Sequence, residues 1–212
     1  MMTRTACRNF YAALRAANPE PRTELLYESP YQLLVAVILS AQATDKSVNA
    51  ATRTLFRVAP EAAAMLKLGV ARLKRHIRTI GLYNSKAKHI IAASRQLLEQ
   101  HGGSVPSDRT ALEALPGVGR KTANVVLSVA FGELTIAVDT QIFRVANRTG
   151  LAPGRTPREV EERLLAVTPA EFLAHAHHWL ILLGRYICKA RRPECPRCPV
   201  NRWCRYPDKV RT

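Results

Sequence analysis

The sequence contains no long apolar run and no stretch in which apolar and polar residues alternate strictly. A membrane-spanning helix needs about 20 consecutive apolar residues, and no segment of this 212-residue chain approaches that length. Strict alternation is typical of half-buried strands, so its absence predicts an all-α protein. Low-complexity segments and linkers are also missing, so two domains, if present, should share a tight interface. We further expect no secretory signal, because residues 1–18 combine arginines with no continuous apolar segment or cleavage site.

Acidic residues are scarce relative to basic ones. Lys and Arg number 32 and Asp and Glu number 16, which gives a formal net charge of +16. A chain of this size with such an excess is expected to bind a polyanion, and nucleic acid is the leading candidate. An anionic membrane surface is the alternative.

Apolar periodicity predicts a series of helices separated by glycine and proline. The segment 31–40 is apolar on nearly every face, which places it in the core, and Ser29 and Pro30 resemble its N-cap and first residue. Two later helices should begin with capping boxes, at Thr156 and at Thr168, each followed by proline and then glutamate. Further helical patterns cover residues 3–17, 46–58, 60–67, 70–79, 85–101, 107–115, 120–131 and 140–149.

The segment LPGVGRKTA, residues 115–123, predicts a helix, a tight hairpin and a second helix. Pro116 ends the first helix, because the residue before a proline is pushed out of the α region. Gly117 and Gly119 permit backbone that side chains would block. Such a hairpin, which also includes Val118 and Arg120, can direct backbone N–H groups at one phosphate.

Lys121 should lie in the first turn of the second helix. A helix N-terminus carries partial positive charge, and this would lower the pKa of an ammonium there. Partial burial of Lys121 would lower its pKa further, as an amine nucleophile requires. From the hairpin residues alone, contact with a phosphate is favoured over a role as nucleophile.

Asp139, Gln42, Ile80 and Leu82 are weaker candidates taken singly. Asp139 opens a helical pattern that reaches about Thr149, and it is best interpreted as an N-cap carboxylate. Gln42 lies in a polar surface turn and is unremarkable by itself. Ile80 and Leu82 flank a glycine; inward packing is favoured, but exposed apolar side chains there could wedge into a base stack.

Four of the five cysteines are Cys188, Cys195, Cys198 and Cys204, and Cys7 is expected to be a small buried apolar residue. Structural zinc usually takes two short ligand pairs, whereas this spacing contains one C-x-x-C pair. An iron–sulfur cluster is therefore favoured over zinc, with disulfides third. We expect the loop, with Arg191 and Arg192 in it, to bind phosphate while the metal holds it rigid; a merely solvated basic tail is the alternative.

Taken together, these pieces resemble the endonuclease III family of base-excision DNA glycosylases, essentially from end to end. The matching motifs are AQATD at 41–45, IGLYNSKA at 80–87, LPGVGRKTA at 115–123, VDT at 138–140 and the cysteine spacing. The hairpin alone would be a weak signal. Its combination with Lys121, Asp139 and the four cysteines is highly specific.

The resemblance implies a two-lobed, all-α helix-hairpin-helix glycosylase fold with the site in the cleft between the lobes. A six-helix barrel would cover residues 23–133, and residues 1–22 with 134–212 would form the other lobe. The four cysteines would carry a [4Fe-4S] cluster over residues 188–204. The protein would be a monomer in a reducing cytoplasm, associated with the nucleoid and with no membrane partner.

The resemblance also implies the reaction. Lys121 would attack C1′ of an oxidised pyrimidine nucleotide in double-stranded DNA, or of an abasic site, form a Schiff base and cut the strand by β-elimination. Asp139 would stabilise positive charge on the sugar or help Lys121 lose its proton. Gln42 and Leu82 would fill the gap left by the extruded nucleotide, with Ile80 a weaker candidate.

One residue departs from the family pattern, since Gln141 stands where many members have histidine after Asp-Thr. Substrate preference or rate is the property this change would affect. Two other functions compete with the bifunctional enzyme. An adenine-mismatch glycosylase shares the fold and cluster but typically lacks the lysine and adds a C-terminal domain. A zinc-stabilised DNA-binding module would have no activity.

Overall fold

The computed structural model describes residues 2–210, which form α-helices, two short 3-10 helices and no strand. The predicted all-α class is therefore confirmed. The chain divides into two compact units. One is residues 23–132, and the other joins the N-terminal segment up to Arg22 to the part that begins at Glu133.

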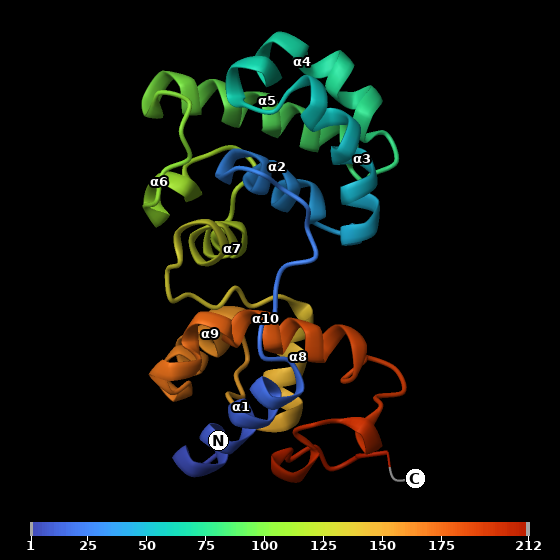
Figure 1. Ribbon diagram of the computed structural model, residues 1–212, viewed down its shortest axis with the longest axis vertical. Helices are drawn as coiled ribbons and strands as arrows, with labels where there is room; N and C mark the ends of the chain where they lie inside the picture. Colours follow the sequence, from blue (N-terminus) through green and yellow to red (C-terminus); the bar gives the residue numbers. More distant parts are fainter. Residues whose placement is uncertain (1, 211–212) are drawn as a thin grey trace. The chain divides into compact units, whose positions relative to one another are not determined.

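The unit of residues 23–132 is built around α2 (Pro30–Ser40). Every residue from Tyr31 to Leu39 is buried, and α2 packs against α3 (Asp45–Val58), α5 (Tyr83–His101) and α7 (Arg120–Phe131), as Figure 1 shows. The Ser29 hydroxyl accepts a hydrogen bond from the Gln32 N–H, and Pro30 is the first helical residue, as predicted.

The remaining helices of this unit are α4 (Ala62–Ile77) and α6 (Arg109–Glu113). The two helical patterns predicted on either side of Gly69 are both present within α4, and they meet at a break, because Gly69 has φ 75° and ψ 164°, outside the helical region. The helix before the hairpin ends at Glu113 instead of Leu115, so α6 is shorter than predicted. A regular helix therefore stops three residues before Pro116.

The other unit contains α1 (Arg4–Ala17), α8 (Thr140–Thr149), α9 (Pro157–Val167) and α10 (Ala170–Tyr186). Within it, α10 packs against α8 and α1, and α9 packs against α8. Its core contains an aromatic group in which the Tyr11 ring stacks on Phe172 with centroids 5.7 Å apart. Two 3-10 helices, η1 (Cys195–Arg197) and η2 (Asn201–Trp203), follow α10 in the cysteine-rich segment.

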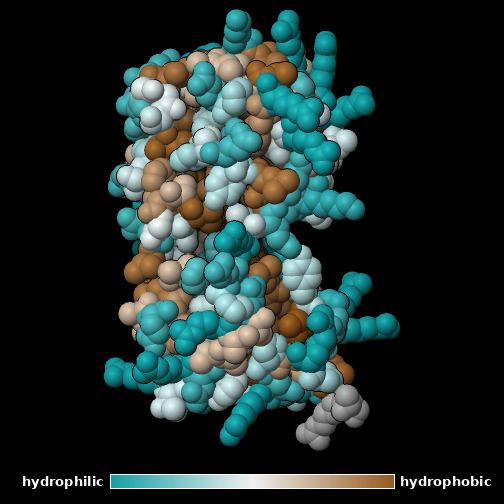
Figure 2. Space-filling model, in the orientation of Figure 1, coloured by the Kyte–Doolittle hydropathy of each residue, from teal (hydrophilic) through white to brown (hydrophobic). Residues whose placement is uncertain are grey.

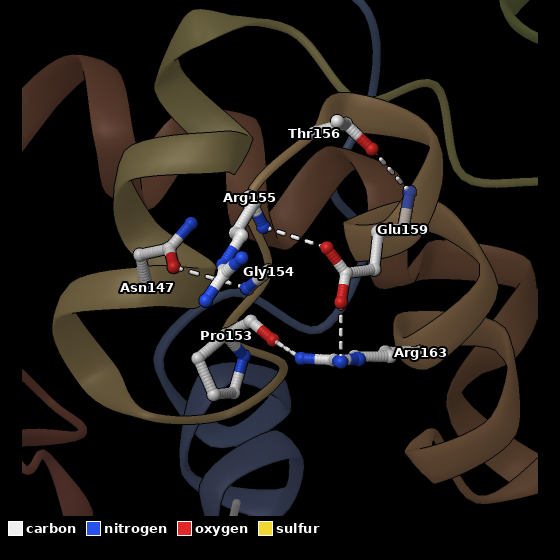
Figure 3. A network of polar contacts seen from close by, with 7 residues as sticks. All are labelled: Asn147, Pro153, Gly154, Arg155, Thr156, Glu159 and Arg163. Carbon is white, nitrogen blue, oxygen red and sulfur yellow. Dashed lines mark hydrogen bonds and ion pairs between the residues drawn. The ribbon is translucent and has the colours of Figure 1, made fainter.

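The predicted capping box at Thr156 is present with one change (Figure 3). The Thr156 hydroxyl accepts from the Glu159 N–H at 3.2 Å. In a capping box the glutamate accepts from the N–H of the N-cap residue, here Thr156. The Glu159 carboxylate instead accepts from the Arg155 N–H at 2.8 Å, and it forms an ion pair with Arg163. The Arg155 N–H first, and then the Arg163 charge, lower the pKa of Glu159.

The second predicted capping box, at Thr168, is wrong. Pro169 is the N-cap of α10 and provides no side-chain cap, while Thr168 ends α9. The Thr168 hydroxyl is buried and hydrogen-bonds the Tyr11 hydroxyl at 2.9 Å. Burial raises the pKa of Tyr11 strongly, so this phenol stays neutral and serves the core.

Hydrophilic side chains cover most of the face drawn in Figure 2, and apolar ones occur there in small patches. Within residues 2–210, no helix combines the length and the apolar character that crossing a bilayer would require. The exposed large apolar residues include Leu82.

Candidate active site and nucleic-acid interface

The hairpin between α6 and α7 is held by its own backbone. The Leu115 N–H donates to the Leu112 carbonyl at 3.1 Å, and the Val118 N–H donates to the Leu115 carbonyl at 3.0 Å. Gly117 has φ 81°, and a Cβ there would lie 2.8 Å from the Cβ of His89. Glycine is therefore required at 117 both by the backbone conformation and by the lack of space.

Two of the expectations for this hairpin need correction. Gly119 has an extended backbone with φ −100°, and no atom beyond its two chain neighbours lies within 4 Å of where its Cβ would be. The fold therefore does not need glycine at 119, and the space beside it is open. Val118 is buried and uses its N–H within the hairpin, so it shapes the turn and offers no donor to a ligand.

Lys121 lies in the first turn of α7, as predicted, and Gly119 caps this helix without a side chain. The Lys121 side chain is exposed, so the partial burial that would favour its neutral form is absent from this structure. Arg120, beside it, is half-buried. An exposed amine and an uncrowded helix start leave room for a large anionic ligand.

Asp139 is the N-cap of α8, as predicted. Its Oδ1 accepts hydrogen bonds from the Gln141 N–H at 2.9 Å and the Ile142 N–H at 2.8 Å. The preceding residues, 135–138, are buried and fix the chain that leads to it. Asp139 belongs to the unit that begins at Glu133, and Lys121 belongs to the unit that ends at Gly132.

Gln141 packs closely against α10. A Cβ added to Gly184 would lie 3.0 Å from the Gln141 Cβ, which leaves little freedom at this point. The Gln141 Oε1 is buried and has no hydrogen-bond partner among residues 2–210. Gln141, where many family members have histidine, therefore places a buried Oε1 acceptor without a donor in the first turn of α8, the helix that Asp139 caps.

Gln42 and Leu82 share an unusual conformation. Both have a left-handed backbone, with φ 57° and 59°, and both side chains are exposed. Their turns are adjacent, because a Cβ at Gly81 would lie 3.8 Å from the Gln42 carbonyl oxygen. Ile80 instead is only 2% exposed, so the suggestion that it wedges into DNA is wrong. The predicted inward packing is therefore confirmed for Ile80 and wrong for Leu82.

Lys86, which the sequence reasoning did not assign, lies directly behind these two turns. Its side chain is buried, and its Nζ donates to the Leu39 carbonyl at 2.8 Å and the Ala41 carbonyl at 2.5 Å. Burial lowers the pKa of this ammonium. The one signal that could have found it was its place inside the IGLYNSKA motif.

All four clustered cysteines border one cavity, whose other walls include Leu183 and Ile187. The thiols form no disulfide, and among residues 2–210 no three His, Cys, Asp or Glu side chains converge to hold a single metal ion. Two N–H groups point at sulfur, from Tyr206 to the Cys204 Sγ at 3.5 Å and from Arg148 to the Cys188 Sγ at 3.9 Å. Burial raises the pKa of Cys198 to about 11.

Two arginines of α8 hold the cysteine segment in place, and sequence spacing gave no signal for them. Arg144 donates to the carbonyls of Cys188 at 3.0 Å and Gly184 at 2.9 Å. Arg148 donates to the carbonyls of Lys189 and Ala190 at 2.6 and 2.9 Å. The segment between Cys188 and Cys195 is therefore fixed against α8, while the side chains of the DNA-contact candidates Arg191 and Arg192 are exposed.

Comparison with known proteins gives a family for this arrangement. Residues 35–170 match the model of the HhH-GPD superfamily of base excision DNA repair proteins. The endonuclease III of Escherichia coli (strain K12) is 64% identical over 197 residues, which are 93% of this chain and 93% of that protein. The endonuclease III of Haemophilus influenzae is 58% identical over 209 residues, 99% of each chain.

Solved structures agree with the sequence relatives. A trapped endonuclease III–DNA covalent intermediate superimposes with a TM-score of 0.91 at 42% identity, over 97% of each chain. A non-covalent endonuclease III–DNA complex gives the same TM-score and identity over 97% of this chain and 96% of that one. This chain belongs to the endonuclease III family of helix-hairpin-helix DNA glycosylases and abasic-site lyases.

Proposed function

We propose that this protein removes oxidised pyrimidines from double-stranded DNA and then cuts the strand through a Schiff base on Lys121. As a member of its family it is a base-excision-repair DNA glycosylase with abasic-site lyase activity. The observation that carries the assignment of Lys121 is its exposure in the first turn of α7, next to a hairpin with open space at Gly119.

The chemistry follows from an amine nucleophile. The Lys121 Nζ, once deprotonated, attacks C1′ and displaces the base, which takes up a proton as it leaves. The resulting amine ring-opens the sugar to a Schiff base, and this imine acidifies the proton at C2′. Loss of that proton expels the 3′ phosphate, which is the β-elimination. The target nucleotide has to leave the base stack first, because C1′ is shielded inside a duplex.

Asp139 supplies the negative charge of the proposed site. Two backbone N–H groups hold its Oδ1, so the carboxylate is oriented by the start of α8 before any substrate arrives. It serves the reaction by stabilising positive charge that develops on the sugar or by helping Lys121 to lose its proton. Both roles require the same negative carboxylate.

We expect three surfaces of the protein to bind DNA. The hairpin around Gly117 and Gly119, with Arg120, binds a phosphate at the N-terminus of α7. Gln42 and Leu82, both exposed, fill the gap that the extruded nucleotide leaves. Arg191 and Arg192 contact further phosphates from the cysteine segment. The partner is DNA with damaged pyrimidines or abasic sites, and the protein acts as a monomer in a reducing compartment.

A [4Fe-4S] cluster fits the four cysteines. Cys188, Cys195, Cys198 and Cys204 border a common cavity with apolar walls, and N–H donors face two of the sulfurs. Thiolate ligands with N–H···S hydrogen bonds are what such clusters take, and a segment this short lacks a core of its own. When bound, the cluster would supply folding energy to the segment that carries Arg191 and Arg192.

Borohydride trapping on a duplex with one oxidised pyrimidine tests this function. We expect a covalent protein–DNA adduct with the wild type and none with Lys121→Gln. Lys88→Gln removes an equal charge from an exposed lysine of α5 and should still be trapped. Trapping that survives Lys121→Gln would refute the nucleophile. A colourless protein with stoichiometric zinc and no cutting of abasic DNA would instead indicate a DNA-binding module.

A further inference from the structure

Lys86 is the one charged residue among the buried residues of the unit 23–132, whose other buried polar residues are the uncharged Gln32, Thr52, Ser94 and Asn124. It is 5% exposed and belongs to α5, whose buried residues around it include Ala87 and Ile90. Lysine is almost never fully buried unless its ammonium is paired. Here Nζ donates to two neutral carbonyls, those of Leu39 and Ala41, and burial lowers the pKa of the group. The fold keeps an ammonium where an apolar side chain of equal length would pack without desolvation.

The two carbonyls identify what the ammonium does. The last four carbonyls of a helix have no partner inside it, and α2 ends at Ser40 with Ala41 as a non-glycine C-cap. Lys86 reaches this end from another helix and satisfies one carbonyl within the last turn and one just beyond it. The negative end of the helix dipole favours a cation there. Gln42, directly after the cap, takes the left-handed conformation that glycine often adopts at a helix end, and the buried lysine supplies further donors to this end.

Lys86 also joins the two turns that carry Gln42 and Leu82. Gln42 directly follows Ala41, whose carbonyl Lys86 holds, and Leu82 is one helical turn before Lys86, whose N–H donates to the Leu82 carbonyl at 3.1 Å. Gln42 and Leu82 are two of three residues other than glycine with positive φ within residues 2–210. A left-handed backbone at such residues is strained and persists only where the surrounding structure enforces it.

We propose that Lys86 is the positioning residue for DNA distortion, holding the Gln42 and Leu82 turns at the spacing that keeps the target nucleotide extruded. This inference rests on the proposed function, in which those two side chains fill the gap in the duplex. Because the turns are fixed before DNA binds, little ordering remains to be done at the moment of extrusion. Lys86 acts through these two turns, not on the substrate.

The test compares activity on two substrates with Lys86→Met and with Lys88→Met, which removes an equal charge from an exposed position of the same helix. A single-stranded abasic oligonucleotide needs no extrusion from a stack, whereas a duplex with an oxidised pyrimidine does. For Lys86→Met we expect a loss on the order of 10- to 100-fold on the duplex and a change within about twofold on the single strand. Lys88→Met should leave the ratio of the two activities unchanged.

A merely structural role for Lys86 would lower both activities together, and that outcome would overturn the inference. If Lys86→Met does not fold, Lys86→Gln, which retains one amide donor group, is measured in its place, with the same expected ratio. Lys86→Arg keeps the charge and the donors, and should recover part of the duplex activity. Fluorescence of 2-aminopurine opposite the lesion gives a second readout, because it rises when the stack opens.

Gln42→Ala combined with Leu82→Ala separates the inference from the function on which it rests. We expect the same duplex-specific loss from this pair, and no further loss when Lys86→Met is added, because all three act in one step. Additive losses would mean that Lys86 works elsewhere and would overturn the inference. A wild type that cuts neither substrate would instead refute the proposed function. If the double variant Gln42→Ala, Leu82→Ala keeps full activity on the duplex, these two side chains do not fill the gap, and the positioning role of Lys86 is refuted as well.

Discussion

Gly117 and Gly119 lie in one hairpin but respond differently to a side chain, which alanine substitutions separate. Gly117→Ala puts a Cβ 2.8 Å from His89 at φ 81° and should destabilise the fold by about 1–3 kcal/mol. Gly119→Ala meets open space and should cost under about 1 kcal/mol, as a weaker N-cap.

The same pair tests the phosphate site. If the DNA backbone approaches the start of α7, the added methyl of Gly119→Ala should weaken DNA binding several-fold with little change in stability. Denaturant unfolding and binding to an abasic duplex at fixed salt measure the two effects. Equal affinity of Gly119→Ala and wild type would remove this helix start from the DNA interface.

His178 is the residue whose titration should be visible in stability. Burial first, and the nearby charge of His175, lower its pKa to about 4, and its Nδ1 is buried with no hydrogen-bond partner among the described residues. The unfolded chain takes up this proton near pH 6.5, so it binds more protons than the folded state between about pH 6.5 and 4. Stability is therefore lost as the pH falls through that window.

The expected loss from His178 is at most about 3 kcal/mol, and nearer 1–2 after solvent screening. Urea unfolding of wild type and His178→Gln at pH 7 and at pH 4.5 measures it. The glutamine variant should lose less stability on acidification. An identical loss in both proteins would mean that the ring takes up its proton as easily in the folded state as in the unfolded chain.

At the scale of the helix, Asp139 combines a cap with a proposed catalytic charge, and two substitutions distinguish these roles. Asp139→Asn keeps an N-cap oxygen and should leave stability nearly unchanged, whereas Asp139→Ala should cost about 1 kcal/mol. Both should lower glycosylase activity on the order of 100-fold or more, because neither carries the charge. Thermal melting and strand cutting are measured on the same samples.

Asp108 offers the matched control, because it caps α6 by accepting from the Ala111 N–H at 2.8 Å and is exposed. Asp108→Ala should cost similar stability without the activity loss. Glycosylase activity that persists in Asp139→Asn would reduce Asp139 to a structural cap.

The helix starts show what local sequence can and cannot predict. Ser29, Asp139 and Thr156 cap their helices as predicted, because a cap needs only an oxygen and an N–H two or three residues away. Thr168 begins the same Thr-Pro-x-Glu pattern as Thr156 and does not cap, since its hydroxyl bonds Tyr11, 157 residues distant in the chain. No sequence window contains that partner.

The candidate site divides in the same way. The hairpin, the place of Lys121 on α7 and the Asp139 cap follow from turn and capping rules. These rules do not predict which of Ile80 and Leu82 is buried, because both are apolar and flank one glycine. The fold buries Ile80 and exposes Leu82. Lys86 was missed for the opposite reason, since composition gives a lysine a strong expectation of exposure.

For the whole molecule, charge was the most informative property of the sequence. A formal net charge of +16 predicts a polyanionic partner independently of any motif. Composition does not show how the basic residues between Arg185 and Lys209 are held in a defined segment. The structure supplies part of the means through Arg144 and Arg148, and the four cysteines suggest the remainder.

Removal of the proposed cluster should release only that segment. The chain from Cys188 to Tyr206 has η1 and η2 as its regular structure, and its anchors on α8 are hydrogen bonds that an opened segment would lose. We expect trypsin to cut after Arg191 in the cluster-free protein and to spare the loaded one; the bond after Arg192 precedes Pro193 and resists trypsin. Residues 23–132 should stay protected in both, because their core contains none of the four cysteines.

DNA affinity should fall in the cluster-free protein, and its dependence on salt should become shallower as phosphate contacts are lost. Identical digestion with and without the cluster would mean that the arginines of α8 suffice to hold the segment, and the cluster would then need a role other than folding.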